Sequence, residues 1–421
     1  MDMLVKIKSF SIQRFFEYLF VFVTILQCNT VFYSHSKLMR IEILTAWFAL
    51  FGVLIFLGFY KIYMNKLNIL PLVKFILVFS MCIIVFLTVE YINVPYKIDN
   101  MFLYMIIPIG SVFIFYSDLN DRKNLRLLLE FKKVIFVIAV ISLIFWFGSI
   151  LKIPTNSSIL IDWGGQRVIP GYFGIHYIAQ NSIDFLGINT IRNTGFFDEA
   201  PMYSYVLSVG LIIKFLLDDE TKRWNKETFI LLFTLVTTTS TTGVLLSVLT
   251  IAYYILFVSK LKKYGWLRGL VFIILIPSVL LLFRIIVMKK MDSSWYSSSS
   301  LRLDDFYAGF MSWKDHPWIG NGLDNETSVL KYVDYRRLSM IGGSGFSNGV
   351  MNVLSLGGIS LLSFYLMPVL IMIKVSTKML GLSLLLFVLF IFTIINGVYL
   401  YIILLGYIWY VYITKDISIR R

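Results

Sequence analysis

The sequence has little charge, few cysteines and few histidines. Only 15% of its 421 residues are charged, whereas 58% are hydrophobic, and this composition excludes an ordinary soluble protein. The two cysteines, Cys28 and Cys82, both lie in apolar stretches, where a cysteine usually acts as a small buried hydrophobe. No His/Cys ligand cluster and no Asp-x-Asp motif of the nucleotide-sugar type is present. We therefore expect neither a metal ion nor a cofactor.

Apolar stretches of about 20 residues recur along the chain, and a helix of that length crosses a hydrocarbon core of roughly 30 Å. The sequence therefore predicts an all-α, polytopic transmembrane helix bundle of about twelve spans, forming a single membrane domain over residues 1–421. The first span has no small-residue cleavage site, so we expect an uncleaved anchor. The predicted spans are residues 15–34, 41–60, 71–92, 101–117, 134–151, 201–217, 228–241, 243–259, 269–287, 350–373, 379–395 and 397–414.

The net charge of +14 would suggest nucleic acid binding in a soluble protein. Here the basic residues concentrate in the short loops on the side of the N-terminus; residues 260–268, with three lysines and one arginine, are typical. This asymmetry fits the positive-inside rule and predicts that both termini are cytoplasmic. The excess charge indicates topology, and we expect no nucleic-acid partner.

Two long loops, residues 152–200 and 288–349, emerge on the predicted outer face, where we expect the chemistry. Glycines and aromatic residues in the first loop indicate a structured cap. In the second, the spacing of Leu303, Phe306, Phe310 and Trp313 predicts a short amphipathic helix on the membrane surface, or an ordinary loop helix. The polar residues 237–243 suggest either a broken helix pair lining a cavity or a tight turn.

Four short segments carry the strongest functional signal. Residues 192–201 hold an Arg, two carboxylates and a Pro directly before a predicted helix, and residues 241–243 have the pattern Thr-Thr-Gly. Residues 316–322 read His-Pro-Trp-Ile-Gly-Asn-Gly, and Asn348 precedes Gly358 by ten positions. Together and in this order, the segments resemble the superfamily of O-antigen polymerases (Wzy) and O-antigen ligases.

The resemblance implies a metal-independent glycosyltransferase of the bacterial plasma (inner) membrane. Its donor would be an undecaprenyl-pyrophosphate-linked glycan, and its acceptor a sugar hydroxyl of another lipid-linked repeat unit of O-antigen, capsule or exopolysaccharide. A polysaccharide chain-length regulator is an expected partner besides membrane lipid. The ligases carry a functional His immediately before the Asn, where this chain has Ser347, so the prediction is polymerase, with ligase as the alternative.

Cations should stabilise the departing pyrophosphate, and an arginine binds phosphate oxygens with two donors. Arg192 is the first candidate; its alternative role is to bind lipid headgroups. His316 is the candidate general base, since imidazole ordinarily exchanges protons near neutral pH, although a structural His bonded to a loop carbonyl is the alternative. Glu199 is the third catalytic candidate, or an ion-pair partner of Arg192. Candidate substrate-binding residues are Arg284, Arg302, Arg336, Arg337 and Asn348.

Other polar residues compete with these candidates. Asp198, Asp304 and Asp305 are alternative carboxylates, but the last two suit a helix start. His35 and His176 have no supporting context and are interpreted as structural. A flippase or other transporter of the same lipid-linked units is the second functional alternative. Since a transporter should carry ionisable residues at mid-bilayer depth and the predicted spans are nearly free of charge, transferase is preferred.

Overall fold

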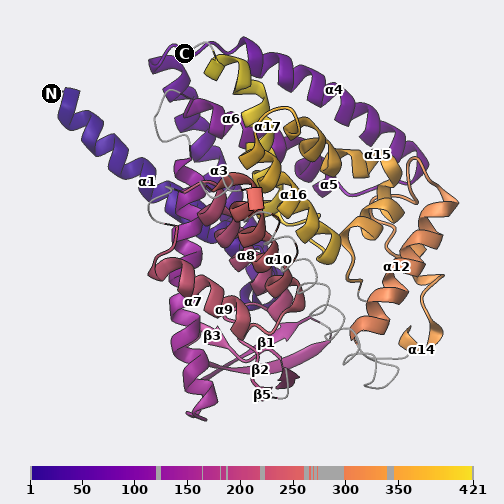
Figure 1. The fold of residues 1–421 in the computed structure, drawn as a ribbon. Coiled ribbons are helices and arrows are strands. Elements are labelled where there is room, and N and C mark those ends of the chain that lie inside the picture. Colours follow the sequence, from indigo (N-terminus) through magenta and orange to yellow (C-terminus); the bar gives the residue numbers. More distant parts are fainter. Residues whose placement is uncertain are drawn as a thin grey trace. The chain divides into compact units, whose positions relative to one another are not determined.

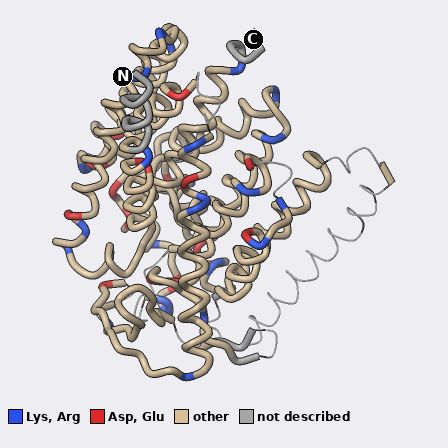
Figure 2. Tube along the Cα trace, turned by 90° about the vertical axis from the view of Figure 1, so that its left-hand side faces the viewer, with Lys and Arg blue, Asp and Glu red and all other residues tan. Residues whose placement is uncertain are grey.

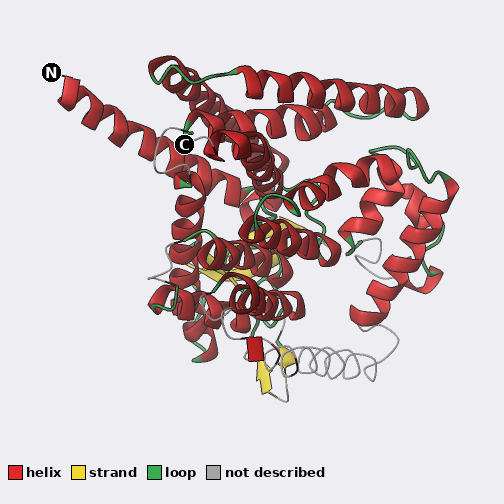
Figure 3. Ribbon diagram, turned by 45° about the horizontal axis from the view of Figure 1, so that its top comes forward, coloured by secondary structure: helices red, strands yellow, loops and turns green. Residues whose placement is uncertain are grey.

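The computed structural model describes residues 2–119, 125–163, 165–180, 182–185, 188–218, 223–259, 265–266, 269, 273, 298–338 and 346–419. Helices dominate these residues, and the few strands are short (Figure 3). The predicted all-α polytopic fold is confirmed. By their internal contacts the residues form two compact units. Unit 1 comprises Met1–Val73, Ile109–Ser247 and Val398–Tyr410, and unit 2 comprises Lys74–Pro108, Val248–Gly397 and Val411–Arg421.

The first unit contains the N-terminal helices and the first long loop (Figure 1). Two of its helices, α10 and α17, begin in this unit and continue past its boundaries at Ser247 and Tyr410. Its helices are α1 (Asp2–Leu26), α2 (Val31–His35), α3 (Lys37–Met64), α6 (Ile107–Ser117), α7 (Arg126–Ile150), α8 (Ala200–Leu216), α9 (Lys226–Thr237), α10 (Thr241–Tyr253) and α17 (Tyr399–Ile419).

The second unit contains the second long loop and the helices around it. Two π-helical turns, η1 (Phe102–Ile106) and η3 (Tyr254–Val258), continue neighbouring α-helices. Its α-helices are α4 (Leu70–Asn93), α5 (Asp99–Met101), α12 (Ser298–Asp315), α13 (Thr327–Leu330), α14 (Tyr335–Leu338), α15 (Gly349–Met372) and α16 (Thr377–Phe392).

The predicted spans that fall on described residues are largely helical, and Figure 2 shows the long uncharged stretches of the chain. The predicted span 269–287 lies almost wholly outside the described residues. In the described part of the chain six helical stretches are long and apolar enough to cross a membrane: Lys37–Met64, Leu70–Asn93, Asp99–Ser117, Arg126–Ile150, Thr241–Val258 and Gly349–Met372. Three apolar helices are shorter: Ala200–Leu216, Thr377–Phe392 and Tyr399–Lys415. A total of twelve crossings stays a prediction.

The first predicted span, residues 15–34, is not one continuous helix. Helix α1 ends at Leu26, Asn29 adopts a left-handed conformation with φ 46°, and Thr30 caps the separate helix α2. Thr30 forms a β-bridge with Phe197, and the amide of Val31 donates to the carbonyl of Phe196. The break therefore gives the first long loop backbone partners that an unbroken helix would not offer.

The first long loop is structured, as predicted, but by strands. Strands β1 (Ser157–Asp162), β2 (Gln166–Tyr172) and β3 (His176–Tyr177) form an antiparallel sheet in that order, and β4 (Ile183–Phe185) pairs with β5 (Ile188–Thr190). His35 Nδ1 lies 2.7 Å from the Leu160 carbonyl and so ties α2 to β1. His176 is buried, and burial lowers its pKa to about 4. The contact with Leu160 supports the structural interpretation of His35, whereas that of His176 stays a prediction.

Helix α12 confirms the helix predicted in the second long loop. It begins at Ser298, so Asp304 and Asp305 lie in its interior, and the interpretation of these two residues as a helix start is wrong. Leu303, Phe306 and Phe310 form an exposed apolar face. Asp305 and Ala308 lie on the buried side of the helix. The position of α12 on the membrane surface stays a prediction.

Buried ion pairs join three helices of unit 1 at the ends predicted to face the cytoplasm. Lys214 of α8 places its Nζ 2.9 Å from Asp218 and 2.8 Å from Glu227. Lys132 of α7 lies 2.6 Å from Asp218 and 3.2 Å from Glu227. Two lysines and two carboxylates therefore neutralise one another where burial would make an unpaired charge costly.

A second cluster joins α1, α3, α6 and α7. Arg126 forms an ion pair with Glu17 and lies 3.8 Å from Asp118, which also pairs with Lys61. All four side chains are buried or nearly so. Several basic residues that indicate topology in the sequence are therefore also structural links between helices.

Replacing Lys214 by Met should destabilise the protein. The substitution leaves two buried carboxylates sharing Lys132, and removing one partner of a buried ion pair costs about 3–5 kcal/mol. We expect a clear drop in the thermal unfolding temperature in detergent. Lys74→Met, at an exposed position of α4, is the matched control and should change stability by no more than about 0.5 kcal/mol. A Lys214→Met protein that melts with the wild type would contradict a structural role for the cluster.

Candidate active site

The segment that carries Arg192 lies against the turn between α9 and α10. Arg192 is half-buried, and its Nε donates to the Thr238 carbonyl at 3.3 Å. The Asn193 amide donates to the Thr237 carbonyl at 3.0 Å, and its side chain donates to the Thr237 hydroxyl at 3.1 Å. The segment 192–201 is thus hydrogen-bonded to the turn that directly precedes the Thr-Thr-Gly motif at residues 241–243.

The polar residues 237–243 form a tight turn, one of the two alternatives. Helix α9 ends at Thr237, Thr239 adopts φ 51°, and α10 begins at Thr241. A Cβ added to Gly243 would lie 2.8 Å from the Ser204 Cβ on α8. The glycine of this motif therefore permits close packing of α10 against α8.

Asp198 is a buried carboxylate in the same segment. Its Oδ2 accepts a hydrogen bond from the Ser34 hydroxyl, and its amide donates to the Asn29 carbonyl at 3.1 Å. Its Oδ1 has no hydrogen-bond partner among the described residues. Burial raises the pKa of Asp198 to about 7, although the bond from Ser34 opposes the shift. The carboxyl can thus change protonation near neutral pH.

Glu199 occupies the position before α8. It is half-buried, and its side chain makes no capping hydrogen bond to the helix. Pro201 lies at the start of α8, where the missing proline N–H costs no helical hydrogen bond. The catalytic role of Glu199 stays a prediction.

In unit 2 the His316 motif lies along a kink in α15. The carbonyls of Pro317 and Trp318 accept hydrogen bonds from the amides of Ile359 and Ser360 at 3.0 and 3.1 Å. A little further on, the amide of Gly322 donates to the Leu356 carbonyl at 3.0 Å. Two of the four sequence motifs are therefore brought together in unit 2.

The glycines of these two motifs are required by the close approach of the two backbones. Gly358 has φ 60° and ψ −159° within α15, and an added Cβ would lie 2.5 Å from the Trp318 carbonyl carbon. An added Cβ on Gly320, which has φ 71°, would lie 2.4 Å from the Leu356 carbonyl carbon. No side chain fits at either position without moving the backbone.

His316 presents an exposed side chain at the start of this segment. Its amide donates to the Trp313 carbonyl at 3.1 Å, and its own carbonyl accepts from Gly320 at 2.8 Å. Within the described residues nothing is hydrogen-bonded to its imidazole, so the alternative of a histidine bonded to a loop carbonyl finds no support there. The backbone fixes the residue, and the ring is available to a substrate.

Arg337 is buried in an ion-pair cluster. Its Nη1 lies 3.0 Å from Asp304 and its Nη2 lies 2.7 Å from Asp305. Ser347 donates to Asp305 through its amide, at 2.9 Å, and through its hydroxyl. Burial raises the pKa of Asp305, whereas Ser347 and Arg337 oppose that shift. Asn348 caps α15 by accepting a hydrogen bond from the Met351 amide at 2.9 Å.

The other predicted arginines differ in their surroundings. Arg336 is exposed, with its Nε 3.4 Å from Asp334 and its guanidinium 5.6 Å from the Tyr335 ring centroid. Arg302 is half-buried on α12, and Arg284 lies outside the described residues. Substrate binding by these residues and by Arg337 and Asn348 stays a prediction.

Sequence reasoning missed Glu90 of α4. Its side chain is fully buried, and within the described residues neither carboxylate oxygen has a hydrogen-bond partner. Val94, directly after α4, lies against Gly322 of the His316 motif: a Cβ added to this glycine would lie 2.7 Å from the Val94 Cβ. The signal was present in the sequence as one acidic residue within a long uncharged run.

The described residues contain no group of three or more His, Cys, Asp and Glu side chains placed to hold a metal ion. Arg192, Asp198 and Glu199 belong to unit 1, whereas His316, Asn348 and the arginines of the second loop belong to unit 2. Unit 2 therefore brings two motifs into contact, and in unit 1 the Arg192 segment contacts the turn that precedes the Thr-Thr-Gly motif. In each unit a long loop meets an interrupted helix or a helical turn.

We compared the chain with known proteins and with models of protein families. No curated protein matches the chain. Residues 228–366, about a third of the chain, match the family model described as O-antigen ligase. That stretch includes the turn between α9 and α10, the His316 motif, Ser347, Asn348 and the α15 kink. Over these residues the chain is similar to the superfamily of O-antigen polymerases and ligases.

Proposed function

We propose that the protein polymerises undecaprenyl-pyrophosphate-linked oligosaccharide repeat units at the outer leaflet of the bacterial plasma membrane. The observation that carries this proposal is that the Arg192 segment binds the α9–α10 turn and the His316 motif binds the α15 kink. The family match covers most of these elements. The product would be an O-antigen, capsule or exopolysaccharide, with a chain-length regulator as a possible partner and both termini in the cytoplasm.

The proposed reaction transfers a glycan between two lipid carriers. The bond from the anomeric carbon of the donor glycan to its pyrophosphate oxygen breaks, and the acceptor sugar hydroxyl forms a new bond to that carbon. The hydroxyl proton passes to a base, for which His316 is our candidate, and polyprenyl pyrophosphate leaves with the bonding electrons. Arg192 would stabilise the negative charge that builds up on the leaving group.

The surroundings of Ser347 favour a polymerase over a ligase. The O-antigen ligases that the sequence resembles carry a functional His where this chain has Ser347, directly before Asn348. In this chain the Ser347 amide and hydroxyl both bind Asp305, which is in turn paired with Arg337. A small side chain held by a carboxylate cannot take over proton transfer from an imidazole. Ligase is the alternative function.

A flippase or other transporter is the second alternative, and Glu90 is the feature that favours it. A buried carboxylate in a membrane helix often marks a transport path. Glu90, however, lies only three residues before the end of α4 at Asn93. That position is near a membrane boundary rather than at the middle of the span, so transferase stays the preferred function.

Deleting the gene from its host tests the reaction type. Without a polymerase, single repeat units should persist on the carrier or reach the cell surface, because no enzyme joins them. Loss of a ligase should instead abolish surface attachment of full-length polymer, and loss of a flippase should trap units on the cytoplasmic side. Gel analysis of surface polysaccharide and mass spectrometry of the lipid carriers measure these outcomes. Full-length polymer after deletion would refute the proposal.

Arg192→Ala should lower the polymerisation rate by about 100-fold or more, since removing one donor to a developing negative charge costs about that much. Arg192→Lys should recover only part of the rate, because an ammonium group cannot bind phosphate with two donors in one plane. Arg167→Ala, at an exposed position of β2, is the matched control and should polymerise normally. Rates come from polymer formation on purified lipid-linked units. Equal rates for Arg192→Ala and Arg167→Ala would remove Arg192 from the site.

His316→Gln and His316→Ala should both lower turnover, because general-base help typically contributes about 10²–10⁴ in rate. Since the side chain is exposed, the variants should insert and melt as the wild type does. The decisive measurement is the rate of polymer formation on purified lipid-linked units, with the melting temperature of each variant as the control for folding. An unchanged rate in both variants would show that another group accepts the proton.

A further inference from the structure

The turn between β2 and β3, residues 173–175, exposes apolar side chains in a loop outside the predicted spans. Phe173 is 70% exposed and Ile175 is 45% exposed. Residues 168–183, which include the turn, contain no Asp, Glu, Lys or Arg. Exposed apolar surface of this kind marks contact with a protein partner or with a membrane.

The turn packs against α7, and it does so before the outer end of this predicted span. The ring centroid of Phe173 lies 6.0 Å from that of Phe145, and Tyr172 stacks on the same ring with centroids 5.7 Å apart. Phe145 lies five residues before the end of α7 at Ile150. Five residues correspond to about 7.5 Å of helix, so the turn reaches back along the span towards the hydrocarbon core.

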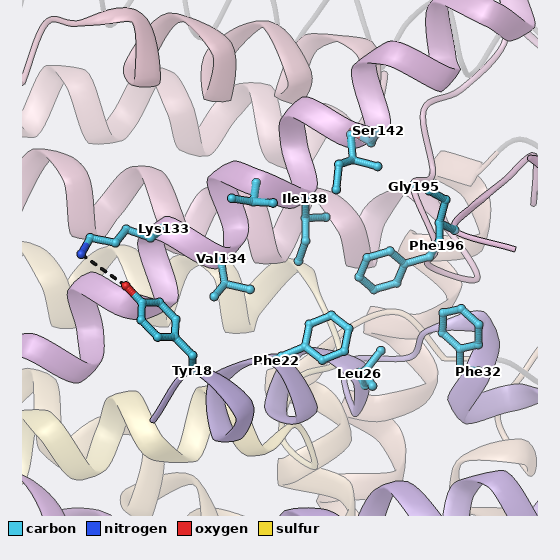
Figure 4. Close-up of a pocket in the computed structure, with 13 residues that line it drawn as sticks. Tyr18, Phe22, Leu26, Phe32, Lys133, Val134, Ile138, Ser142, Gly195 and Phe196 are labelled. Carbon is cyan, nitrogen blue, oxygen red and sulfur yellow. Dashed lines mark hydrogen bonds between the residues drawn. The ribbon is translucent and has the colours of Figure 1, made fainter. Parts of the chain in front are cut away.

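The surface of α7 beside the turn is apolar and exposed. Helix α7 is long and apolar enough to cross a membrane, so the exposed side chains of Ile141 and Ile144 are expected to face lipid. Ile175 lines, together with Ile141, an apolar pocket of about 620 Å³ (Figure 4). The turn therefore continues a surface that faces lipid.

The amides of the turn have hydrogen-bond acceptors within the loop. The amides of residues 173–175 donate in order to the Asn156 side-chain oxygen at 2.8 Å, the Ser157 hydroxyl at 3.1 Å and the Tyr172 carbonyl at 3.0 Å. Hydrocarbon offers no acceptors, so a turn can enter it only when its donors are satisfied internally. The backbone of this turn meets that condition.

Strand β3 links the turn to the segment that carries Arg192. The strand begins directly after the turn. The amide of Tyr177 donates to the Gly195 carbonyl at 2.7 Å, and the Thr194 hydroxyl donates to the Tyr177 carbonyl at 2.7 Å. The depth of the turn therefore sets the height of the Arg192 segment relative to the membrane.

We propose that residues 173–175 insert into the outer leaflet beside α7 and anchor the first long loop, with the Arg192 segment attached, to the lipid. The occupant of this surface is phospholipid rather than a protein partner, because the turn is uncharged and continues the exposed apolar side of a membrane span. Moving the side chains of Phe173 and Ile175 from water into lipid stabilises this position of the loop. The anchor would serve a polymerase and a ligase alike.

Spin labels on single cysteines measure the depth of the turn in the full-length protein, in nanodiscs of phosphatidylethanolamine and phosphatidylglycerol. Cys28 and Cys82 are first replaced by alanine. Oxygen reaches a label in lipid, whereas a water-soluble nickel chelate reaches a label in water. We expect Phe173→Cys to be open to oxygen and shielded from nickel, like the lipid reference Ile144→Cys on α7. Arg167→Cys, at an exposed position of β2, is the water reference.

Two results would overturn the proposal. Nickel access at Phe173→Cys equal to that at Arg167→Cys would place the turn in water, as docking of another protein would require. A label shielded from both reagents would show that the protein itself covers the turn. Ile175→Cys provides the same measurement if Phe173→Cys does not insert into the membrane.

A charge in the turn tests the anchor from the other side. A carboxylate is costly in hydrocarbon, so Phe173→Asp should move a label at Ile175→Cys from lipid to water. Gln166→Asp, at an exposed position of β2, adds the same charge outside the turn and should leave the label in lipid. Equal nickel access in the two variants would contradict an anchor at Phe173.

Polymerisation by the same variants measures what the anchor does for the Arg192 segment. Phe173→Asp should polymerise at least about tenfold more slowly, because a small displacement of a catalytic group is costly in rate, and Gln166→Asp should match the wild type. A Phe173→Asp turn that leaves the lipid without loss of rate would overturn the link to Arg192. A wild-type protein that forms no polymer would refute the proposed function and leave the anchor intact, since the labels report depth without turnover.

Discussion

Backbone amides and carbonyls inside a membrane have no water to bind, so any interruption of a helix needs another partner. The chain interrupts its helices at the α1–α2 break, the α9–α10 turn and the α15 kink. At the kink the amides of Ile359 and Ser360 bind the carbonyls of Pro317 and Trp318. At the α9–α10 turn the Thr237 carbonyl binds the Asn193 amide. The loop segments 192–201 and 316–322 therefore supply hydrogen-bond partners to the interrupted backbone, and they also carry the candidate residues Arg192 and His316.

Charge is arranged by the same constraint. The pairs made by Lys214 with Glu227 and by Arg126 with Glu17 are buried at helix ends, and each neutralises a charge that would be costly alone. On the predicted outer side Arg337 pairs with Asp304 and Asp305 in a similar manner. Arg192 contacts a backbone carbonyl through its Nε, which donates to Thr238 at 3.3 Å.

Much of the fold could be predicted because hydropathy and helix length are local properties. The predicted span 201–217 coincides with α8 almost to the residue. The break at Asn29 could not be predicted, since it depends on a bridge to Phe197 far along the chain. The same holds for Asp305: a carboxylate followed by apolar residues resembles a helix start, and only the distant Arg337 and Ser347 reveal its role. The motifs marked the candidate site, but not which motifs would meet.

Asn193 connects three elements of unit 1. Its side chain donates to the Ser142 hydroxyl of α7 at 3.3 Å and to the Thr237 hydroxyl at 3.1 Å, and its amide donates to the Thr237 carbonyl at 3.0 Å. One turn further along α7, Trp146 Nε1 donates to the Ile191 carbonyl at 2.8 Å. The residues on both sides of Arg192 are therefore held by α7 and by the α9–α10 turn. Because a hydrogen bond weakens steeply when its geometry is disturbed, a change in the packing of either element would shift the backbone that carries Arg192.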